Sequence, residues 1–215
     1  MNEADTCRKL VVPKLQAAGW EIEPHSIAEQ RTITDGRIVP AGKGFIRRPP
    51  KRVDYLLRYT RDFPLAVIEA KASYRLASEG LQQAKDYAIM LGLKFAYATN
   101  GQQVVEFDFL TGLECTRADY PTPDDLWGRY RAKAGLSHPQ ADQLLTPFNH
   151  AVRMGERYYQ QIAVNRVVEA ILTGRRRLLV TMATGTGKPR CSAGNARRSA
   201  LGAAPTPRHP RVRGA

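Results

Sequence analysis

Asp54, Glu69 and Lys71 are the residues of this chain whose types and spacing could do chemistry. Glu69 and Lys71 lie in the apolar run Val67-Ile68-Glu69-Ala70-Lys71, and Asp54 lies 15 residues before Glu69. Carboxylate oxygens are the ligands that Mg²⁺ prefers, and a bound Mg²⁺ can drive phosphodiester hydrolysis. A lysine beside the ion could orient or activate the attacking water and offset developing negative charge. The pattern therefore indicates a metal-dependent nuclease site, with Asp54 and Glu69 as metal ligands.

The element that carries Glu69 and Lys71 is predicted to be a strand. Residues two apart on a strand share a face, so these two side chains point the same way. Their neighbours at positions 66, 68, 70 and 72 then point to the core. Taken alone, Glu-x-Lys is also common on a solvated strand face with a weak ion pair.

A hairpin would bring Asp54 across from this strand. Residues 53–59 and 65–72 predict two strands, and the turn sequence at 61–64 lies between them. Residues 78–91 predict a helix, in which Gln83 and Tyr87 are four apart and share a face.

The rest of the first 115 residues supplies further elements. Residues 3–18 predict a helix that Pro13 would kink or break, and residues 20–22 begin an extended segment. Residues 34–52 predict a loop with a basic arm. Strands at 95–98 and 104–109 flank Asn100-Gly101, which is a strong hairpin signal. The basic arm contains Lys43, Arg47, Arg48, Lys51 and Arg52. This order predicts a mixed α/β (α+β) domain.

A second motif lies far downstream, in Thr181-Met182-Ala183-Thr184-Gly185-Thr186-Gly187-Lys188. Its backbone N–H groups would cradle phosphates, and Lys188 would reach the β- and γ-phosphates of a nucleotide. A helix at 158–172 and a strand at 177–181 would precede it. The next residue should be Ser or Thr to hold Mg²⁺, but it is Pro189, which also removes an N–H from the following helix.

Beyond Lys188 the composition changes to Arg, Ala, Pro and Gly without periodicity. Residues 189–215 are predicted to be a disordered tail. The tail contains six Arg and no acidic residue, so the formal net charge of +13 falls to +7 for residues 1–188. A shifted reading frame or an assembly error would both produce such a junction.

The first 110 residues resemble the N-terminal nuclease domain of type I restriction enzyme R subunits, in the RecB-like branch of the PD-(D/E)xK superfamily. The resemblance lies in an opening Asn-Glu-Ala-Asp-Thr helix, in Arg52-Val53-Asp54-Tyr55 and Ile68-Glu69-Ala70-Lys71, in Gln83-Ala84-Lys85-Asp86-Tyr87, and in Ala98-Thr99-Asn100-Gly101. It implies a restriction-endonuclease-like core with a central mixed sheet flanked by helices.

The resemblance also implies roles. Asp54 and Glu69 would bind metal, Lys71 would be the catalytic lysine, and Gln83 and Tyr87 would support the site or contact DNA. Glu3 could complete the site, although an acidic residue in a first helical turn more often favours the helix dipole. The chain has Val53 where the superfamily has Pro, a tolerated departure.

The downstream motif resembles the start of a superfamily-two helicase motor, which would be an incomplete RecA-like domain. In that family a Gln ahead of the motif binds adenine, and Gln160 matches best here. An ordinary surface Gln remains the alternative. Gly185, Thr186, Gly187 and Lys188 would form a nucleotide site that is not functional.

Charge and cysteine content bound the remaining possibilities. A basic chain suits a polyanionic partner such as nucleic acid. Three widely spaced cysteines indicate neither a zinc site nor a disulfide framework. Neither a signal peptide nor an apolar run of about 20 residues is present. We therefore expect a soluble cytoplasmic protein with no membrane partner.

The sequence thus predicts a nuclease domain (1–115), a linker with short helices (116–150), a truncated motor start (151–188) and the tail (189–215). The resemblance implies a type I site-specific deoxyribonuclease-like enzyme acting on double-stranded DNA. It implies Mg²⁺ as cofactor, ATP in the full-length family, and specificity and methyltransferase subunits as partners. The alternatives are a helicase fragment that binds ATP and DNA, and a non-catalytic module that binds DNA or partner subunits.

Overall fold

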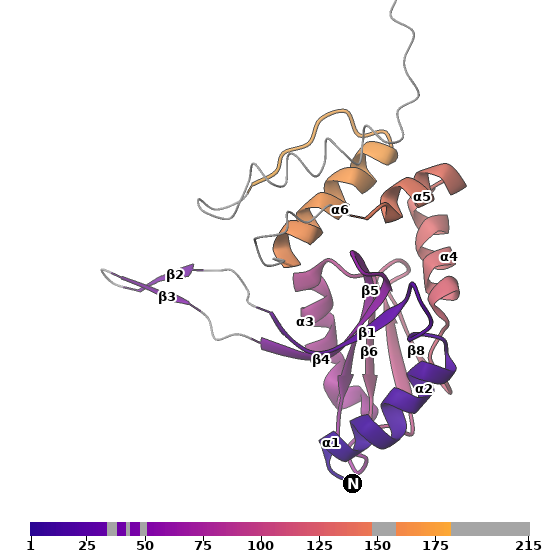
Figure 1. Ribbon diagram of the computed structural model, residues 1–215. Helices are drawn as coiled ribbons and strands as arrows, with labels where there is room; N and C mark the ends of the chain where they lie inside the picture. Colours follow the sequence, from indigo (N-terminus) through magenta and orange to yellow (C-terminus); the bar gives the residue numbers. More distant parts are fainter. Residues whose placement is uncertain (34–37, 42–43, 48–50, 148–157, 182–215) are drawn as a thin grey trace, which may run out of the picture.

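The computed structural model describes residues 1–33, 38–41, 44–47, 51–147 and 158–181. Within these ranges a mixed six-stranded sheet has the order β1-β4-β5-β6-β7-β8 (Figure 1). Its strands are β1 (Ser26–Ile33), β4 (Lys51–Thr60), β5 (Phe63–Ala70), β6 (Phe95–Thr99), β7 (Val104–Asp108) and β8 (Leu113–Arg117). The pairing of β5 with β6 is parallel and the other pairings are antiparallel. The predicted mixed α/β fold is therefore confirmed.

The predicted hairpins are present. β4 and β5 pair antiparallel around the turn at Arg61-Asp62, and β6 and β7 pair around Asn100-Gly101. The Asn100 Oδ1 accepts the N–H groups of Gln102 and Gln103, which stabilises the second turn. The parallel step from β5 to β6 needs a crossover. A short 3₁₀ turn (Ala77–Gly80) and helix α3 (Leu81–Leu91) provide it.

The N-terminal helix runs from Glu3 to Ala17 without the break that Pro13 could cause, but it changes to a π-helical turn just before that residue. It consists of α1 (Glu3–Thr6), one π-helical turn (Cys7–Val11) and α2 (Val12–Ala17). Pro13 lies in the first turn of α2, where its missing N–H costs least.

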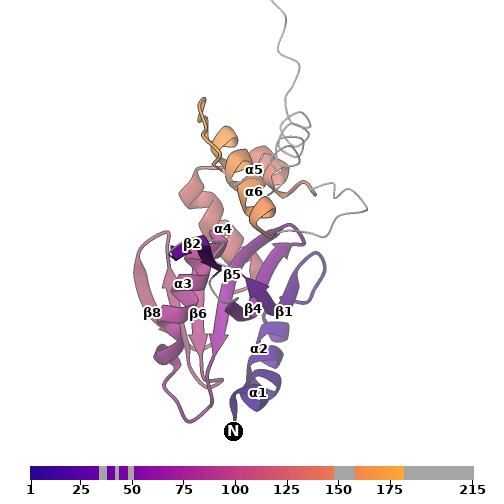
Figure 2. The same ribbon diagram turned by 90° about the vertical axis from the view of Figure 1, so that its left-hand side faces the viewer.

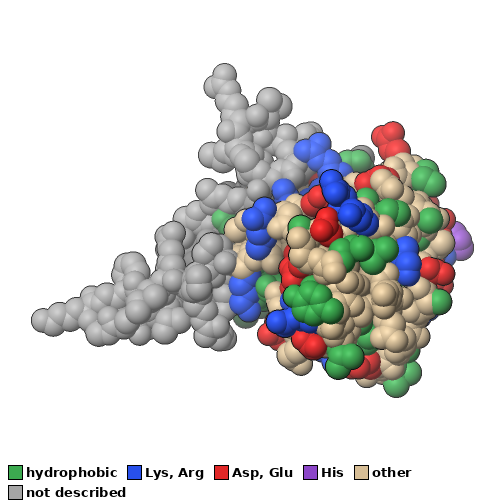
Figure 3. All heavy atoms as spheres, turned by 90° about the horizontal axis from the view of Figure 1, so that it is seen from below, with side chains coloured by type: hydrophobic (Ala, Val, Ile, Leu, Met, Phe, Trp, Pro, Cys, Tyr) green, Lys and Arg blue, Asp and Glu red, His purple; other side chains and the backbone are tan. Residues whose placement is uncertain are grey.

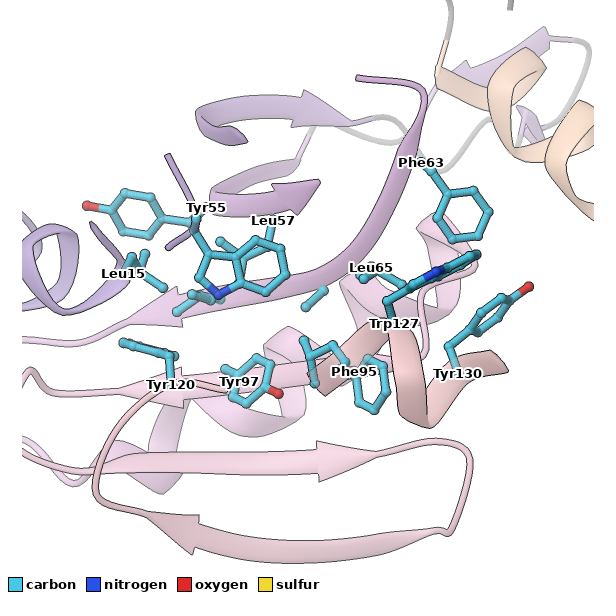
Figure 4. Packing of buried hydrophobic residues seen from close by; sticks show 14 of the residues in the cluster. Leu15, Tyr55, Leu57, Phe63, Leu65, Phe95, Tyr97, Tyr120, Trp127 and Tyr130 are labelled. Carbon is cyan, nitrogen blue, oxygen red and sulfur yellow. The ribbon is translucent and has the colours of Figure 1, made fainter. Parts of the chain in front are cut away.

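Helices cover both faces of the sheet. Figures 1 and 2 show α3 on one side, and Figure 1 shows α2 and α4 (Pro123–Ala134) on the other. On the second side, Leu15, Tyr55 and Trp127 of α4 belong to one buried cluster (Figure 4), which also contains Trp20 and Ile68. On the α3 side, the buried residues are Val53, Leu56, Val67, Ala84, Tyr87, Ala88, Leu91 and Ala96, among others. β5 is buried on both faces, as expected for a strand with a parallel neighbour.

Helix α4 is part of the main core. Leu126, Trp127 and Tyr130 belong to the same buried cluster as Phe63 and Phe95. The Trp20 indole N–H donates to the carbonyl of Pro121, 101 residues later, which fastens the N-terminal helix segment to the start of α4. The segment predicted as a linker thus contributes α4 and α5 (His138–Leu145) to the folded unit.

An ion-pair cluster also fixes α4 to the sheet. Arg129 contacts Glu106 and Asp108 at 2.6 Å, and Arg117 contacts Glu106 at 2.6 Å. Glu106 is 1% exposed, and two guanidinium groups balance its buried charge. The hydroxyl of Tyr97 also donates a hydrogen bond to it.

The last described helix, α6 (Tyr158–Leu172), has the predicted bounds and packs on the turn between β4 and β5. Gln161 Nε2 donates to Asp62 Oδ1 at 2.9 Å, and Asn165 Nδ2 donates to the Asp62 carbonyl at 2.8 Å. None of the helices in the described ranges is long and apolar enough to span a bilayer.

Three expectations were wrong. The extended segment was expected to begin at residues 20–22, but these residues form a turn and a bend, and the segment begins at Ser26 as β1. The predicted loop at 34–52 contains the hairpin of β2 (Ile38–Ala41) and β3 (Gly44–Arg47) and the first two residues of β4. Residues 177–181 are not a strand, and Leu179 is 93% exposed, because no neighbouring strand pairs with them in the described part of the chain.

Candidate active site

Asp54 lies on the α3 side of the sheet, next to the end of β5. The register pairs Tyr55 with Ile68. The adjacent positions, Asp54 and Glu69, therefore both face the opposite side from this pair. The Asp54 Oδ2 accepts the backbone N–H of Ala70 at 2.9 Å. The hairpin thus brings Asp54 to the strand that carries Glu69, as the sequence predicted.

Glu69 is 3% exposed and is held by one cation. Lys71 Nζ donates to Glu69 Oε1 at 2.8 Å. The other oxygen, Oε2, is buried without a hydrogen-bond partner. A buried carboxylate oxygen with no partner is costly. It is the kind of group that a cation would satisfy.

The electrostatics of the pair follow from burial and proximity. Burial is the main cause that raises the pKa of Glu69 to about 7, and the charges of Asp54 and Glu3 add to it while Lys71 opposes it. Burial acts to lower the pKa of Lys71, but the bond and charge of Glu69 outweigh it, and the pKa is raised. Lys71 is therefore a cation at neutral pH, and Glu69 is close to its titration point.

Gln83 and Tyr87 continue the hydrogen-bonded chain along α3. Lys71 Nζ donates to Gln83 Oε1 at 3.3 Å, and Gln83 Nε2 donates to the Tyr87 hydroxyl at 2.8 Å. Tyr87 is 5% exposed. The two residues share one helix face, as their spacing predicted, and they link Lys71 to the helix that covers the site.

Glu3 lies at the border of this cluster. It is an exposed residue in the first turn of α1. Its charge nevertheless contributes to raising the pKa of Glu69 and of Lys71. The structure thus places Glu3 near the site and leaves Asp54 and Glu69 as its buried carboxylates.

Two residues at the site were missed by the sequence analysis. A Cβ added at Gly80 would lie 3.2 Å from Glu69 Cγ and 3.3 Å from Lys71 Cε, so this glycine lets the 3₁₀ turn approach the site closely. Gln30 Nε2 donates to Asp54 Oδ1 at 3.3 Å. A glycine directly before an apolar helical repeat was a weak signal for the first residue. No sequence signal pointed to the second.

The residues present fit a Mg²⁺ ion. Within the described ranges, no three His, Cys, Asp or Glu side chains form a metal cluster. Mg²⁺ usually needs only one or two carboxylates, because water and substrate phosphate supply its other ligands. Asp54 and the unpartnered oxygen of Glu69 could provide those carboxylates.

The predicted nucleotide site is described only in part. Gln160 lies on α6 and is 6% exposed, so it is not an ordinary surface residue. Gly185, Thr186, Gly187 and Lys188 lie outside the described residues, as does the tail from 189 onward.

A mixed sheet with an acidic pair and a lysine at the end of its central hairpin defines a restriction-endonuclease-like domain. The chain is 35% identical over 195 residues to the Type I restriction enzyme EcoAI endonuclease subunit of Escherichia coli. It matches the solved structure of a fragment of a putative HsdR subunit of a type I restriction enzyme from Vibrio vulnificus YJ016, with a TM-score of 0.83 and 50% identity. The chain is thus a homologue of the endonuclease (HsdR) subunits of type I restriction enzymes.

These matches cover most of this chain but only part of each relative. The chain contributes 87% of its length to the first match and 92% to the second, but spans only 24% and 38% of the respective relatives. The family described as ResIII, "Type III restriction enzyme, res subunit", matches residues 153–202. The helicase-like similarity therefore begins just before α6.

Proposed function

We propose that this chain carries the Mg²⁺-dependent DNA endonuclease site of a type I restriction enzyme. The observation that carries the proposal is the buried cluster of Asp54, Glu69 and Lys71, in which Glu69 Oε2 has no hydrogen-bond partner. The kinship to endonuclease subunits supports it. A solvated Glu–Lys pair, which was the alternative, does not fit a glutamate that is 3% exposed.

Each side chain has a separate task. Asp54 and Glu69 would hold the ion, which would supply Lewis-acid stabilisation and a nucleophilic water. Lys71 is charged, because its pKa is raised. It therefore acts as a cation that offsets negative charge on the scissile phosphate rather than as a neutral base. Gln83 Oε1 also accepts a hydrogen bond from the ammonium group, and Gln83 in turn donates to the Tyr87 hydroxyl.

The substrate of the site is double-stranded DNA. The partners of the chain are the specificity and methyltransferase subunits of a type I complex. The basic residues at the start of β4, Lys51 and Arg52, would neutralise backbone phosphates without reading bases. The motif at Gly185–Lys188 would bind ATP in a complete motor. Pro189 follows where a Mg²⁺-binding hydroxyl is needed, so this nucleotide site is not functional in the present chain.

Nicking of supercoiled plasmid by the full chain tests the proposal. We expect weak nicking that needs Mg²⁺ and is indifferent to sequence, with DNA binding that weakens steeply with salt. Asp54→Ala and Glu69→Gln should reduce nicking by about a hundredfold or more. Even residues that only support metal ligands cost roughly 10- to 100-fold when they are removed.

The matched control is Glu114→Gln, which changes a half-exposed glutamate on β8 paired with Lys85. It should nick like the native chain. DNA binding should survive in all three variants, since the basic residues are unchanged. Nicking that persists in Asp54→Ala, or that targets one sequence without other subunits, would refute the assignment.

A further inference from the structure

Gln30 occupies an unusual position in β1, opposite Asp54. The register pairs Glu29 with Tyr55 and Arg31 with Val53, and the pair between them, Gln30 and Asp54, is skipped. Gln30 has a φ of 49°, and it is the one residue other than glycine with positive φ in the described ranges. The strand is thus distorted at the position that faces the proposed metal ligand.

A left-handed backbone is unfavourable for a residue with a Cβ, and Gln is not among the residues that tolerate it best. Such a conformation persists only where surrounding contacts enforce it, and it is common at functional sites. A regular strand at this point would need no such distortion. We therefore expect the positive φ of Gln30 to be stabilised by a contact that only this conformation supplies.

That contact is the hydrogen bond to Asp54. Gln30 Nε2 donates to Asp54 Oδ1 at 3.3 Å, and the Ala70 N–H donates to Asp54 Oδ2 at 2.9 Å. One donor on each oxygen fixes the plane of the carboxylate and leaves a lone pair on each oxygen free. The Ala70 N–H is part of the backbone beside Glu69, so the two donors align Asp54 with the other carboxylate.

We infer that Gln30 is a positioning residue that orients the Asp54 carboxylate for a divalent cation. The inference rests on the proposed function, because it needs a cation at Asp54 and Glu69. Gln30 itself does not react. Its role is that of the hydrogen-bonding groups that orient ligands around metal sites.

Two variants separate this role from the backbone distortion. Gln30→Gly removes the amide and tolerates positive φ. Gln30→Asn keeps an amide and also tolerates positive φ, but it is one methylene too short for the bond. Neither variant should lower the melting temperature of the metal-free chain. Gln102→Asn removes the same methylene from an exposed glutamine in the β6–β7 turn and serves as control.

The experiment is a calorimetric titration of the full chain with Mn²⁺ alone. Thermal unfolding of the metal-free proteins is measured beside it. We expect both Gln30 variants to bind Mn²⁺ roughly tenfold more weakly than the native chain and the control. Affinity within about twofold of the native value, a change small beside that expectation, would overturn the inference. So would a loss of affinity matched by a lower metal-free melting temperature, since Gln30 would then be structural. A native chain that binds no Mn²⁺ would overturn the proposed function itself.

Discussion

Replacing Glu69 by Gln should stabilise the metal-free protein, and increasingly so as the pH rises. The pKa of Glu69 is about 7 in the folded chain, against an ordinary value of 4.5, mainly because of burial. Below pH 4.5 the carboxyl is protonated in both states, so it adds no pH dependence. Between 4.5 and 7 the unfolded chain releases a proton that the folded chain keeps, and stability falls as the pH rises.

The size of the effect follows from the same two values. At about 1.4 kcal/mol per pH unit, the native chain loses about 3 kcal/mol of stability between pH 4.5 and 7 through this one group. The Gln variant has no such titration. Leaving Lys71 without its partner also changes the unfolding free energy of the variant, and a pH-independent effect of this kind is the same at pH 6 and pH 8. The quantity to compare is therefore the change of the unfolding free energy with pH.

Urea unfolding of both proteins at several pH values measures it. The difference in unfolding free energy should grow in favour of the variant from pH 5 to pH 8. Mg²⁺ at about 100 times its dissociation constant should return about 2.7 kcal/mol to the native chain alone. A difference that is constant with pH would show that Glu69 titrates normally and would refute the reasoning.

Four further predictions concern the site, helix α4, the core and the nucleotide motif. Gly80→Ala should reduce Mg²⁺-dependent nicking with little change in melting temperature, because the new methyl group would displace the side chains at the end of β5. Gly128→Ala, which meets nothing within 4 Å, should leave nicking intact and stabilise α4 by up to about 1 kcal/mol. Trp127→Ala should lower the unfolding free energy by about 3–5 kcal/mol in denaturant titrations, as for large core aromatics. The chain should release no phosphate from ATP, because Pro189 stands where the metal-binding hydroxyl is needed; release that is lost in Lys188→Ala would contradict this.

The parts of the fold that the sequence predicted are those with strong local signals. Asn100-Gly101 marked one hairpin, and the period of apolar residues marked α3 and α6. β8 was missed because most of its residues are exposed and show no apolar alternation, and for the same lack of pattern the extended segment that contains β1 was expected to begin at residue 20 instead of Ser26. The role of α4 was missed since its Pro-rich start is typical of a linker, whereas Trp127 packs against residues distant in sequence.

The candidate site shows the same division. Strand alternation and a hairpin sufficed to place Asp54 beside Glu69 and Lys71, and a four-residue helical spacing placed Gln83 and Tyr87 on one face. Gln30 could not be found in this way, because its contact depends on a backbone distortion in a strand that had no pattern of its own. Gly80 required knowledge of how closely the 3₁₀ turn approaches β5.

The bond between Trp20 and Pro121 has a consequence for synthesis of the chain. Trp20 is fully buried, and its partner is made 101 residues later. At roughly 5–20 residues per second, a ribosome needs about 5–20 s to cover that interval, during which the Trp20 indole lacks its native hydrogen-bond acceptor. The sheet likewise emerges before the aromatic side chains of α4 that cover it. A product that stopped at residue 115 would lack Trp127 and Tyr130 of this cluster and would leave the apolar face of the sheet open to aggregation.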